Sequence, residues 1–175
     1  MTLEHEPPLN RLQILQLTLN KSQKAHLNSI NRPLGNNWDL MLIQEPYITP
    51  LGHIRTPNGF KLISPQDHFL NNSDQTRSVI WVNSKLSLNS WKVMNIAGTN
   101  DITVLQIKMP DGQLSIFNIY NDCTHSLMLA KLKQFIHLEQ HQNLTSARDT
   151  ILWGGNFNWH HPLWDDDGDE RLFTS

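Results

Sequence analysis

The sequence predicts an α+β domain in which two sheets pack face to face and helices cover the sheets. Three observations support this prediction: a strand-then-helix opening, several strands in direct succession, and an amphipathic helix before a last apolar strand. Strands that follow one another without helices exclude a purely parallel, doubly wound sheet. A chain of 175 residues suits one domain, assigned to residues 10–175, after a loose arm at residues 1–9.

The first half of the chain supplies short strands. Leu12–Leu19 is an apolar run with polar interruptions, which predicts a strand, and the capped segment Gln23–Ile30 predicts a short helix. The next apolar strand starts at Trp38 and delivers Glu45 at its C-terminal end, before a proline that favours extended backbone. A carboxylate at this position is well placed to hold a metal ion. After a loop rich in Pro and Gly, Phe60–Ser64 predicts another strand.

The middle of the chain predicts a run of strands and then a helix. The turn Pro110-Asp111-Gly112 joins two of these strands into an antiparallel hairpin. The segment His125–His141 predicts an amphipathic helix with a single core-facing stripe of apolar residues. The predicted strands are Ser78–Val82, Trp91–Ile96, Ile102–Met109 and Gln113–Tyr120.

The stretch from Ile151 to Trp164 organises the candidate site. Three apolar residues run into a Gly pair, which predicts a buried strand that ends where the backbone turns with little side-chain bulk. Ligand chemistry in α/β sheets collects outside the carboxyl ends of strands. We therefore place the site at this strand end, together with the strand-end residues Glu45 and Tyr120. The polar residues that follow the Gly pair are Asn156, Asn158, His160 and His161.

Composition limits the functional classes. The hydrophobic share of 38% and the charged share of 17% are typical of a globular protein, and we expect no membrane span. The first residues lack the pattern of a secretory signal, and the single cysteine, Cys123, excludes an internal disulfide. These features predict an intracellular location, nuclear or cytoplasmic. The net charge of −2 means that any DNA binding would have to be local.

Three motifs occur in a specific order: Gln44-Glu45-Pro46, Asn118-Ile119-Tyr120-Asn121, and Asn156-Phe157-Asn158 with His160-His161-Pro162 behind it. From Leu12 onwards the chain resembles the endonuclease/exonuclease/phosphatase superfamily, in the form carried by the endonucleases of non-LTR retrotransposons. The resemblance implies a deoxyribonuclease I-like fold and hydrolysis of DNA phosphodiesters with Mg²⁺ or Mn²⁺. It implies that Glu45 binds the ion, that Tyr120 positions phosphate, and that Asn156 and Asn158 occupy the positions that orient and activate water.

The chain departs from the family pattern at three places. Thr18 stands where the family has an Asn that supports the metal ligand, and Asn156 stands where it has an Asp. The family's final strands, with a phosphate-contacting His, have no counterpart before Ser175. We therefore expect a truncated or decayed copy with weak metal binding and impaired activity. An uncovered sheet edge would also invite self-association.

A second set of residues is assigned to nucleic-acid binding. Aromatic and histidine side chains in one loop suit stacking on bases or contact with a sugar-phosphate backbone. The alternatives are a non-catalytic remnant that binds nucleic acid or protein, and an enzyme for small phosphate esters; the segment His160–Trp164 favours the nuclease lineage over the phosphatase one. The assigned residues are Arg77, Trp159, His160, His161 and Trp164.

Each assignment has a structural alternative. Glu45 could be an ordinary exposed carboxylate, Tyr120 a core residue with a satisfied hydroxyl, and the two tryptophans a cover for the core. Three other patterns are weaker. His137 and His141 have metal spacing but more often complement a helix dipole; Cys123 and His125 lack an orienting third group; and the acidic run 165–170 lacks calcium-ligand spacing.

Overall fold

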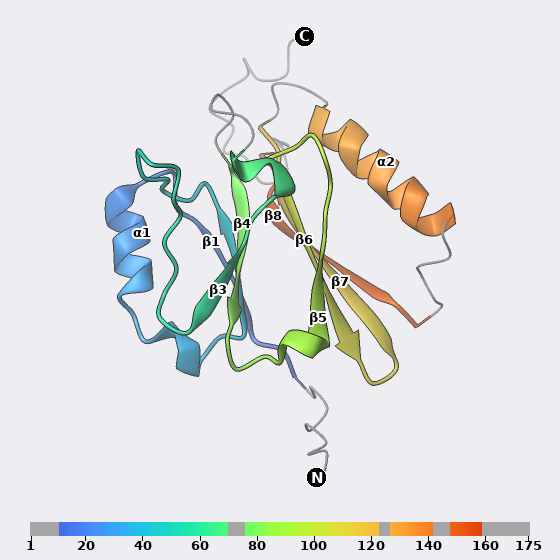
Figure 1. Ribbon diagram of the computed structural model, residues 1–175, viewed down its shortest axis with the longest axis horizontal. Helices are drawn as coiled ribbons and strands as arrows, with labels where there is room; N and C mark the ends of the chain where they lie inside the picture. Colours follow the sequence, from blue (N-terminus) through green and yellow to red (C-terminus); the bar gives the residue numbers. More distant parts are fainter. Residues whose placement is uncertain (1–10, 70–75, 123–126, 142–147, 159–175) are drawn as a thin grey trace, which may run out of the picture.

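The computed structural model describes residues 11–69, 76–122, 127–141 and 148–158. The described residues form two mixed four-stranded sheets that pack face to face (Figure 1). In sheet A the strand order is β1-β2-β4-β3, and in sheet B it is β5-β6-β7-β8. Sheet A contains β1 (Ile14–Thr18), β2 (Leu40–Gln44), β3 (Phe60–Ile63) and β4 (Ser78–Asn83), and sheet B contains β5 (Trp91–Met94), β6 (Ile102–Met109), β7 (Gly112–Tyr120) and β8 (Thr150–Asn156).

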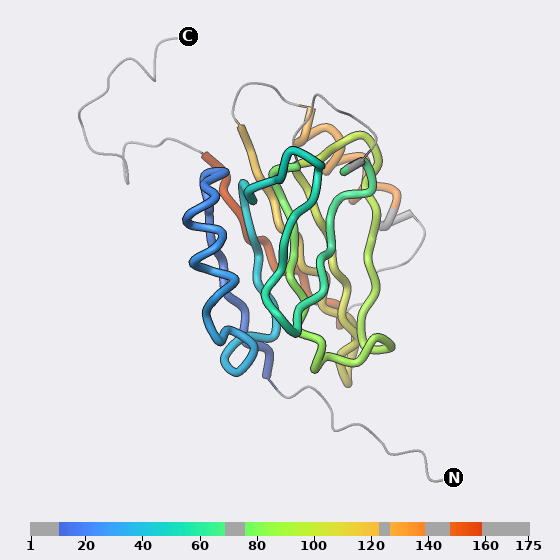
Figure 2. Tube along the Cα trace, turned by 60° about the vertical axis from the view of Figure 1, so that its left-hand side comes forward, coloured from blue at the N-terminus to red at the C-terminus, as the bar shows by residue number. Residues whose placement is uncertain are grey.

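One helix covers the outer face of each sheet. The helix α1 (Gln23–Ile30) packs on sheet A, and α2 (Leu127–His141) packs on sheet B (Figure 1). The segment between β2 and β3, coloured cyan to teal, lies over the same outer face of sheet A as α1 (Figure 2). Short 3-10 helices occupy Leu34–Asn36, Gln66–Phe69 and Leu88–Ser90.

Strand β2 shows how the sequence builds the layers. All five of its residues are buried, because β2 lies inside sheet A with packing on both faces. Leu40 and Leu42 face the core between the sheets, whereas Met41 and Ile43 face the core under α1. This alternation is the period of two expected for a strand. Each fully buried side chain of this size contributes about 1.5–3 kcal/mol of hydrophobic stabilisation.

The predicted elements are largely confirmed. The helix Gln23–Ile30 and the strand Ile102–Met109 have the predicted bounds, and β6 and β7 form the predicted antiparallel hairpin. Two pairs, β1 with β2 and β7 with β8, are parallel, and the remaining pairs are antiparallel in the part of the chain described. The two-sheet α+β architecture predicted from the strand succession is therefore correct.

The prediction for β8 was wrong in two respects. The strand is not buried, since Ile151, Leu152 and Trp153 are 45%, 37% and 43% exposed at the edge of sheet B. It also continues through the Gly pair instead of ending there. A Cβ on Gly154 would lie 2.5 Å from Leu42 Cδ1, and one on Gly155, whose φ is 137°, would overlap the neighbouring strand. The glycines are needed for close approach between strands and sheets, not for a turn.

Several predictions lie outside the described residues. They are the arm at residues 1–9, the candidate contacts Trp159, His160, His161 and Trp164, the pair Cys123 and His125, and the acidic run 165–170. Within the described ranges, no helix is long and apolar enough to cross a membrane.

Candidate functional site

Glu45 occupies the C-terminal end of β2 in a left-handed backbone conformation, with φ of 48°. Such a conformation is uncommon for a residue other than Gly, and it persists where surrounding contacts hold it. Two backbone hydrogen bonds hold Glu45: its N–H donates to Arg77 O at 2.8 Å, and its carbonyl accepts from Lys21 N at 2.8 Å. The half-buried side chain therefore starts from a fixed backbone position.

Tyr120, at the C-terminal end of β7, meets Glu45 across the two sheets. Its hydroxyl donates a hydrogen bond to Glu45 Oε1 over 3.1 Å. Burial, followed by the hydrogen bond and charge of Glu45, raises the pKa of Tyr120, although a hydrogen bond with Asn158 and the charge of Arg77 act in the opposite direction. The phenol therefore stays protonated at neutral pH and remains a hydrogen-bond donor.

Arg77 supports the Tyr120 ring. The guanidinium carbon lies 5.0 Å from the ring centroid, within the range of a cation–π contact. Arg77 also donates two hydrogen bonds of 2.6 Å to Asp101 and one of 2.9 Å to Asp122. Burial opposes the charge of Arg77, but the bonds and charges of the two aspartates outweigh it and raise the pKa of the guanidinium. Arg77 is fixed in place and always charged.

The chain after β8 folds against the segment after β7. Asn121 N donates to Asn156 O at 2.8 Å, and Asn121 Nδ2 donates to Phe157 O at 2.9 Å. Asn158 Nδ2 donates back to Asn121 O, and Asn158 has a left-handed φ of 44°. The side-chain oxygen of Asn156 accepts from Asn158 N at 3.0 Å, which is a local Asx-type turn.

Buried amides join the two sheets beneath the site. Gln44 Nε2 donates to Asn118 Oδ1, and Asn118 Nδ2 donates to Ile43 O and Val79 O at 3.0 and 2.8 Å. The Thr18 hydroxyl donates to Gln44 Oε1 at 3.3 Å. This network places the end of β2 against β7 near its C-terminal end, so that Glu45 and Tyr120 meet.

A second amide contact holds β8 to sheet A. Gln16 Nε2 donates to Gly155 O at 2.8 Å, while Gly155 N donates to Gln16 Oε1 at 3.1 Å. The Gln16 side chain thus pairs with both backbone groups of Gly155, the residue immediately before Asn156. This contact joins the middle of β1 to the C-terminal end of β8.

The strand-end site offers few charged ligands for a divalent ion in the part of the chain described. Glu45 supplies one carboxylate, and the neighbouring groups are a phenol and amides. The described residues contain no group of three or more His, Cys, Asp or Glu side chains that could hold a metal. Mg²⁺ often uses one or two carboxylates together with water and phosphate oxygens. A site built on Glu45 alone would therefore bind the ion weakly.

The predicted site residues that the structure describes stand at or just after the C-terminal ends of β1, β2, β7 and β8 and just before β4. These strand ends lie together at the top of Figure 1, opposite the β6–β7 hairpin. Tyr120 contacts Glu45, Arg77 and Asn158. Thr18 and Asn156 lie at the same edge but bond to Gln44 and Asn158.

Sequence reasoning missed the residues that support this site. Asn118 and Asn121 stand inside a recognised motif, and Gln16 is two residues before Thr18, but only their neighbours had been given roles. Asp101 and Asp122 anchor Arg77, and no sequence pattern indicated this. Only the strand pairing brings Asp101 beside Tyr120, whose N–H donates to Asp101 O at 2.8 Å.

The fold is similar to that of solved structures that belong to the endonuclease/exonuclease/phosphatase superfamily. The endonuclease domain of TRAS1, a telomere-specific non-LTR retrotransposon, is 18% identical with a TM-score of 0.62; the match covers 92% of this chain and 65% of that domain. The AP endonuclease LMAP from Leishmania major is 10% identical with a TM-score of 0.54, over 82% and 54% of the two chains. TDP2 from Caenorhabditis elegans is 11% identical with a TM-score of 0.53, over 90% and 51%.

At these identities the likeness establishes the fold, and the chain spans less than two thirds of the TRAS1 domain. No protein-family profile and no curated protein matches the sequence. The predicted deoxyribonuclease I-like architecture is thus confirmed.

Proposed function

We propose that this chain binds DNA and that its strand-end site hydrolyses DNA phosphodiesters slowly, with Mg²⁺ or Mn²⁺ held by Glu45. The observation that carries this proposal is the contact between Glu45 and Tyr120, which joins a carboxylate and a phenol donor across the two sheets. Similar folds in a retrotransposon endonuclease and an AP endonuclease support a nuclease function. The single cysteine supports a nuclear or cytosolic location.

Glu45 and Tyr120 would act on the phosphate. A divalent ion at Glu45 would supply positive charge to stabilise the displaced oxygen. The protonated Tyr120 hydroxyl can donate to a phosphate oxygen as well as to Glu45, and Arg77 holds the ring in position. Because two aspartates pair with Arg77, its charge is largely balanced within the site. Its predicted direct contact with nucleic acid stays a prediction, and we assign it the positioning of Tyr120.

Asn156 and Asn158 would orient the attacking water, but neither can accept its proton. An amide lacks a basic pKa near neutrality, and the Asn156 oxygen already accepts a hydrogen bond from Asn158 N. Absence of a general base typically costs about 10²- to 10⁴-fold in rate. Thr18 bonds to Gln44 and does not extend to Glu45 as a longer amide side chain could. We therefore propose that catalysis by this chain is slow.

Nicking of supercoiled plasmid in Mg²⁺, in Mn²⁺ and in EDTA tests the proposal. We expect slow nicking that EDTA and Glu45→Gln both remove. The matched control is Asp111→Asn, which neutralises an exposed carboxylate in the hairpin at the opposite end of β7 and should leave nicking unchanged. Metal-dependent nicking that persists in Glu45→Gln would place the chemistry elsewhere.

A second candidate function is DNA binding without cleavage. The observation that favours it is the amide at Asn156, where the resemblance implies a carboxylate. This alternative predicts that the wild-type chain shifts the mobility of DNA but nicks no plasmid in either metal. In that case the strand-end site at Glu45 and Tyr120 would serve binding alone.

A further inference from the structure

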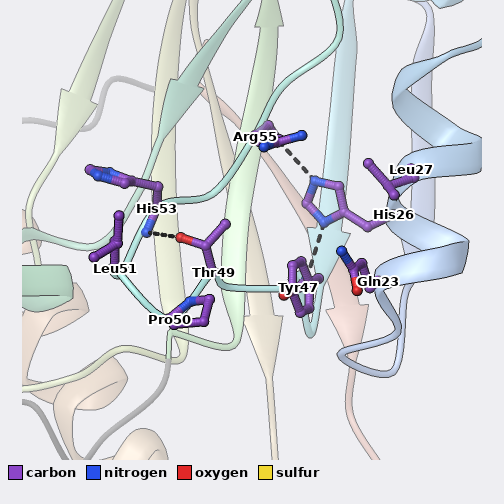
Figure 3. Close-up of a pocket in the computed structure, with 9 residues that line it drawn as sticks. All are labelled: Gln23, His26, Leu27, Tyr47, Thr49, Pro50, Leu51, His53 and Arg55. Carbon is purple, nitrogen blue, oxygen red and sulfur yellow. Dashed lines mark hydrogen bonds between the residues drawn. The ribbon is translucent and has the colours of Figure 1, made fainter.

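A pocket of about 490 Å³ lies between α1 and the loop that follows β2. One wall consists of Gln23, His26 and Leu27 on α1, and the other wall is the loop from Tyr47 to Arg55 (Figure 3). This volume is within the usual range of about 300–1,000 Å³ for pockets that bind small molecules. None of the residues that line this pocket has been given a role in the strand-end site.

The pocket adjoins the strand-end site. Tyr47 follows Glu45 in the sequence with only Pro46 between them. On the other wall, Gln23 is two residues after Lys21, whose N–H donates to Glu45 O at 2.8 Å. Both walls of the pocket are therefore continuous with the segments that meet at Glu45.

His26 fixes the shape of the pocket. Its buried ring accepts from Tyr47 N at 3.1 Å through Nδ1, so Nε2 carries the proton and donates to Arg55 O at 2.9 Å (Figure 3). Burial lowers the pKa of His26, which keeps this neutral form. The loop closes on itself as well, since Thr49 N donates to His53 O at 2.9 Å. Both ring nitrogens of His26 are occupied, so this histidine shapes the pocket and binds no metal.

The lining combines apolar surface with positive charge. Leu27, Leu51 and the Tyr47 ring supply apolar and aromatic surface. Arg55 is exposed at the rim, and none of the described lining residues is acidic. A nucleobase has two apolar faces suited to aromatic and aliphatic contacts, and the attached phosphate favours a nearby cation. A nucleotide satisfies both requirements.

We propose that this pocket holds one unstacked nucleotide of the bound DNA strand, with the base against Tyr47 and Leu27 and its phosphate near Arg55. The proposal rests on the proposed function, because it assumes that DNA crosses the strand-end site. It adds a subsite that would bind one DNA strand at a place where the duplex is unpaired. Single-stranded DNA should consequently bind more tightly than a fully paired duplex of the same length.

The first test compares two exposed leucines. Leu51 is 81% exposed at the pocket, whereas Leu88 is 60% exposed in the 3-10 helix before β5, so neither substitution disturbs the core. Leu51→Glu places a negative charge at the mouth and should weaken binding of a single-stranded oligonucleotide by about fivefold or more, the low end of one lost base-stacking contact. Leu88→Glu should bind like the wild type. Equal affinities of the two variants would overturn the proposal.

The second test uses small probes and nuclear magnetic resonance of the whole chain. Deoxyadenosine monophosphate and deoxyadenosine should both shift the methyl signals of Leu27 and Leu51 while leaving Leu88 unchanged. Shifts that inorganic phosphate alone reproduces, or the absence of any shift, would overturn the assignment of a base-binding pocket.

The two proposals can fail separately. Glu45-dependent nicking with no effect of Leu51→Glu on single-strand binding would reject the pocket and retain the nuclease site. Nucleotide-induced shifts at Leu27 and Leu51 in a chain that neither binds nor nicks duplex DNA would retain the pocket and reject the proposed function.

Discussion

Strands β2 and β8 each deliver a site residue at a C-terminal end, but they are held in different ways. All residues of β2 are buried inside sheet A, and buried amides tie its end to β7. Strand β8 lies at the edge of sheet B with three exposed apolar residues, and an exposed glutamine, Gln16, holds its end. Both strands lead into a left-handed residue, Glu45 and Asn158.

The buried strand β2 and the exposed strand β8 carry groups with different proposed roles. The β2 side keeps the groups proposed for metal and phosphate, namely Glu45 and Tyr120, on a buried support. The β8 side carries the groups proposed for water, Asn156 and Asn158, at the end of an exposed strand and just after it, and both are amides. Asn156, which stands where the resemblance implies a general base, therefore lies on the more exposed of the two strands.

The largest expected effect concerns the amides beneath β2. Asn118→Ala should lower the free energy of unfolding by about 3 kcal/mol, because it leaves the buried Gln44 amide without its acceptor and removes two further buried hydrogen bonds to Ile43 O and Val79 O. Gln16→Ala should cost about 1 kcal/mol, since water can reach the exposed Gln16 site and replace its bonds. Urea unfolding of the two variants measures the difference. Equal losses would mean that both strand ends are held alike.

The next effect concerns the contribution of His26, which holds the loop after β2, to the free energy of unfolding and how this contribution depends on pH. His26→Ala should cost about 2 kcal/mol at pH 7.5, because two part-buried backbone groups, Tyr47 N and Arg55 O, lose their side-chain partner. The pKa of His26 is lowered in the fold, so its contribution is complete above the unfolded value of 6.5 and declines as pH falls through the folded pKa.

Denaturant unfolding between pH 7.5 and 5 tests this prediction. The difference in the free energy of unfolding between wild type and His26→Ala should become smaller as the pH falls. His68, whose pKa burial also lowers, is present in both proteins and cancels in the comparison. A difference in the free energy of unfolding that does not change with pH would show that protonation of His26 is not coupled to folding.

The smallest expected effect concerns association through β8. Its exposed apolar residues and sheet edge invite pairing with a second chain, and we expect light scattering to detect dimers at modest concentration. Ile151→Lys should restore the monomer because a charged residue blocks edge pairing. Leu88→Lys, a substitution of another exposed apolar side chain, is the control and should still associate. A monomeric wild type would contradict the prediction.

Local patterns in the sequence predicted most of the fold. Helix α1 and the β6–β7 hairpin follow from a capped segment and a Pro-Asp-Gly turn, and both are confirmed. The Ile151–Trp153 run gave a wrong prediction, because an apolar run has the same composition whether its strand is central or at an edge. The place of a strand in its sheet depends on pairing with distant residues.

The sequence predicted part of the candidate site. Motifs indicated Glu45 and Tyr120, which the structure brings together. The contacts of Arg77 with Asp101 and Asp122 span 24 and 45 positions in the sequence. The pocket beside Glu45 arises from a helix and a loop that meet only in the fold, so no spacing rule could have indicated it.

Nicking of supercoiled DNA by wild type, Asn156→Asp and Asn156→Asp with Thr18→Asn tests the central claim most directly. Each protein is assayed in Mg²⁺ and Mn²⁺ beside a Glu45→Gln counterpart. Because residues of one catalytic unit are not additive, Asn156→Asp alone should raise the rate by less than the roughly 10²- to 10⁴-fold associated with a general base, and the double variant should raise it further. All of this activity should require Glu45. Rapid, Glu45-dependent nicking by the unaltered chain would contradict the account, because the site would then work without a carboxylate at position 156.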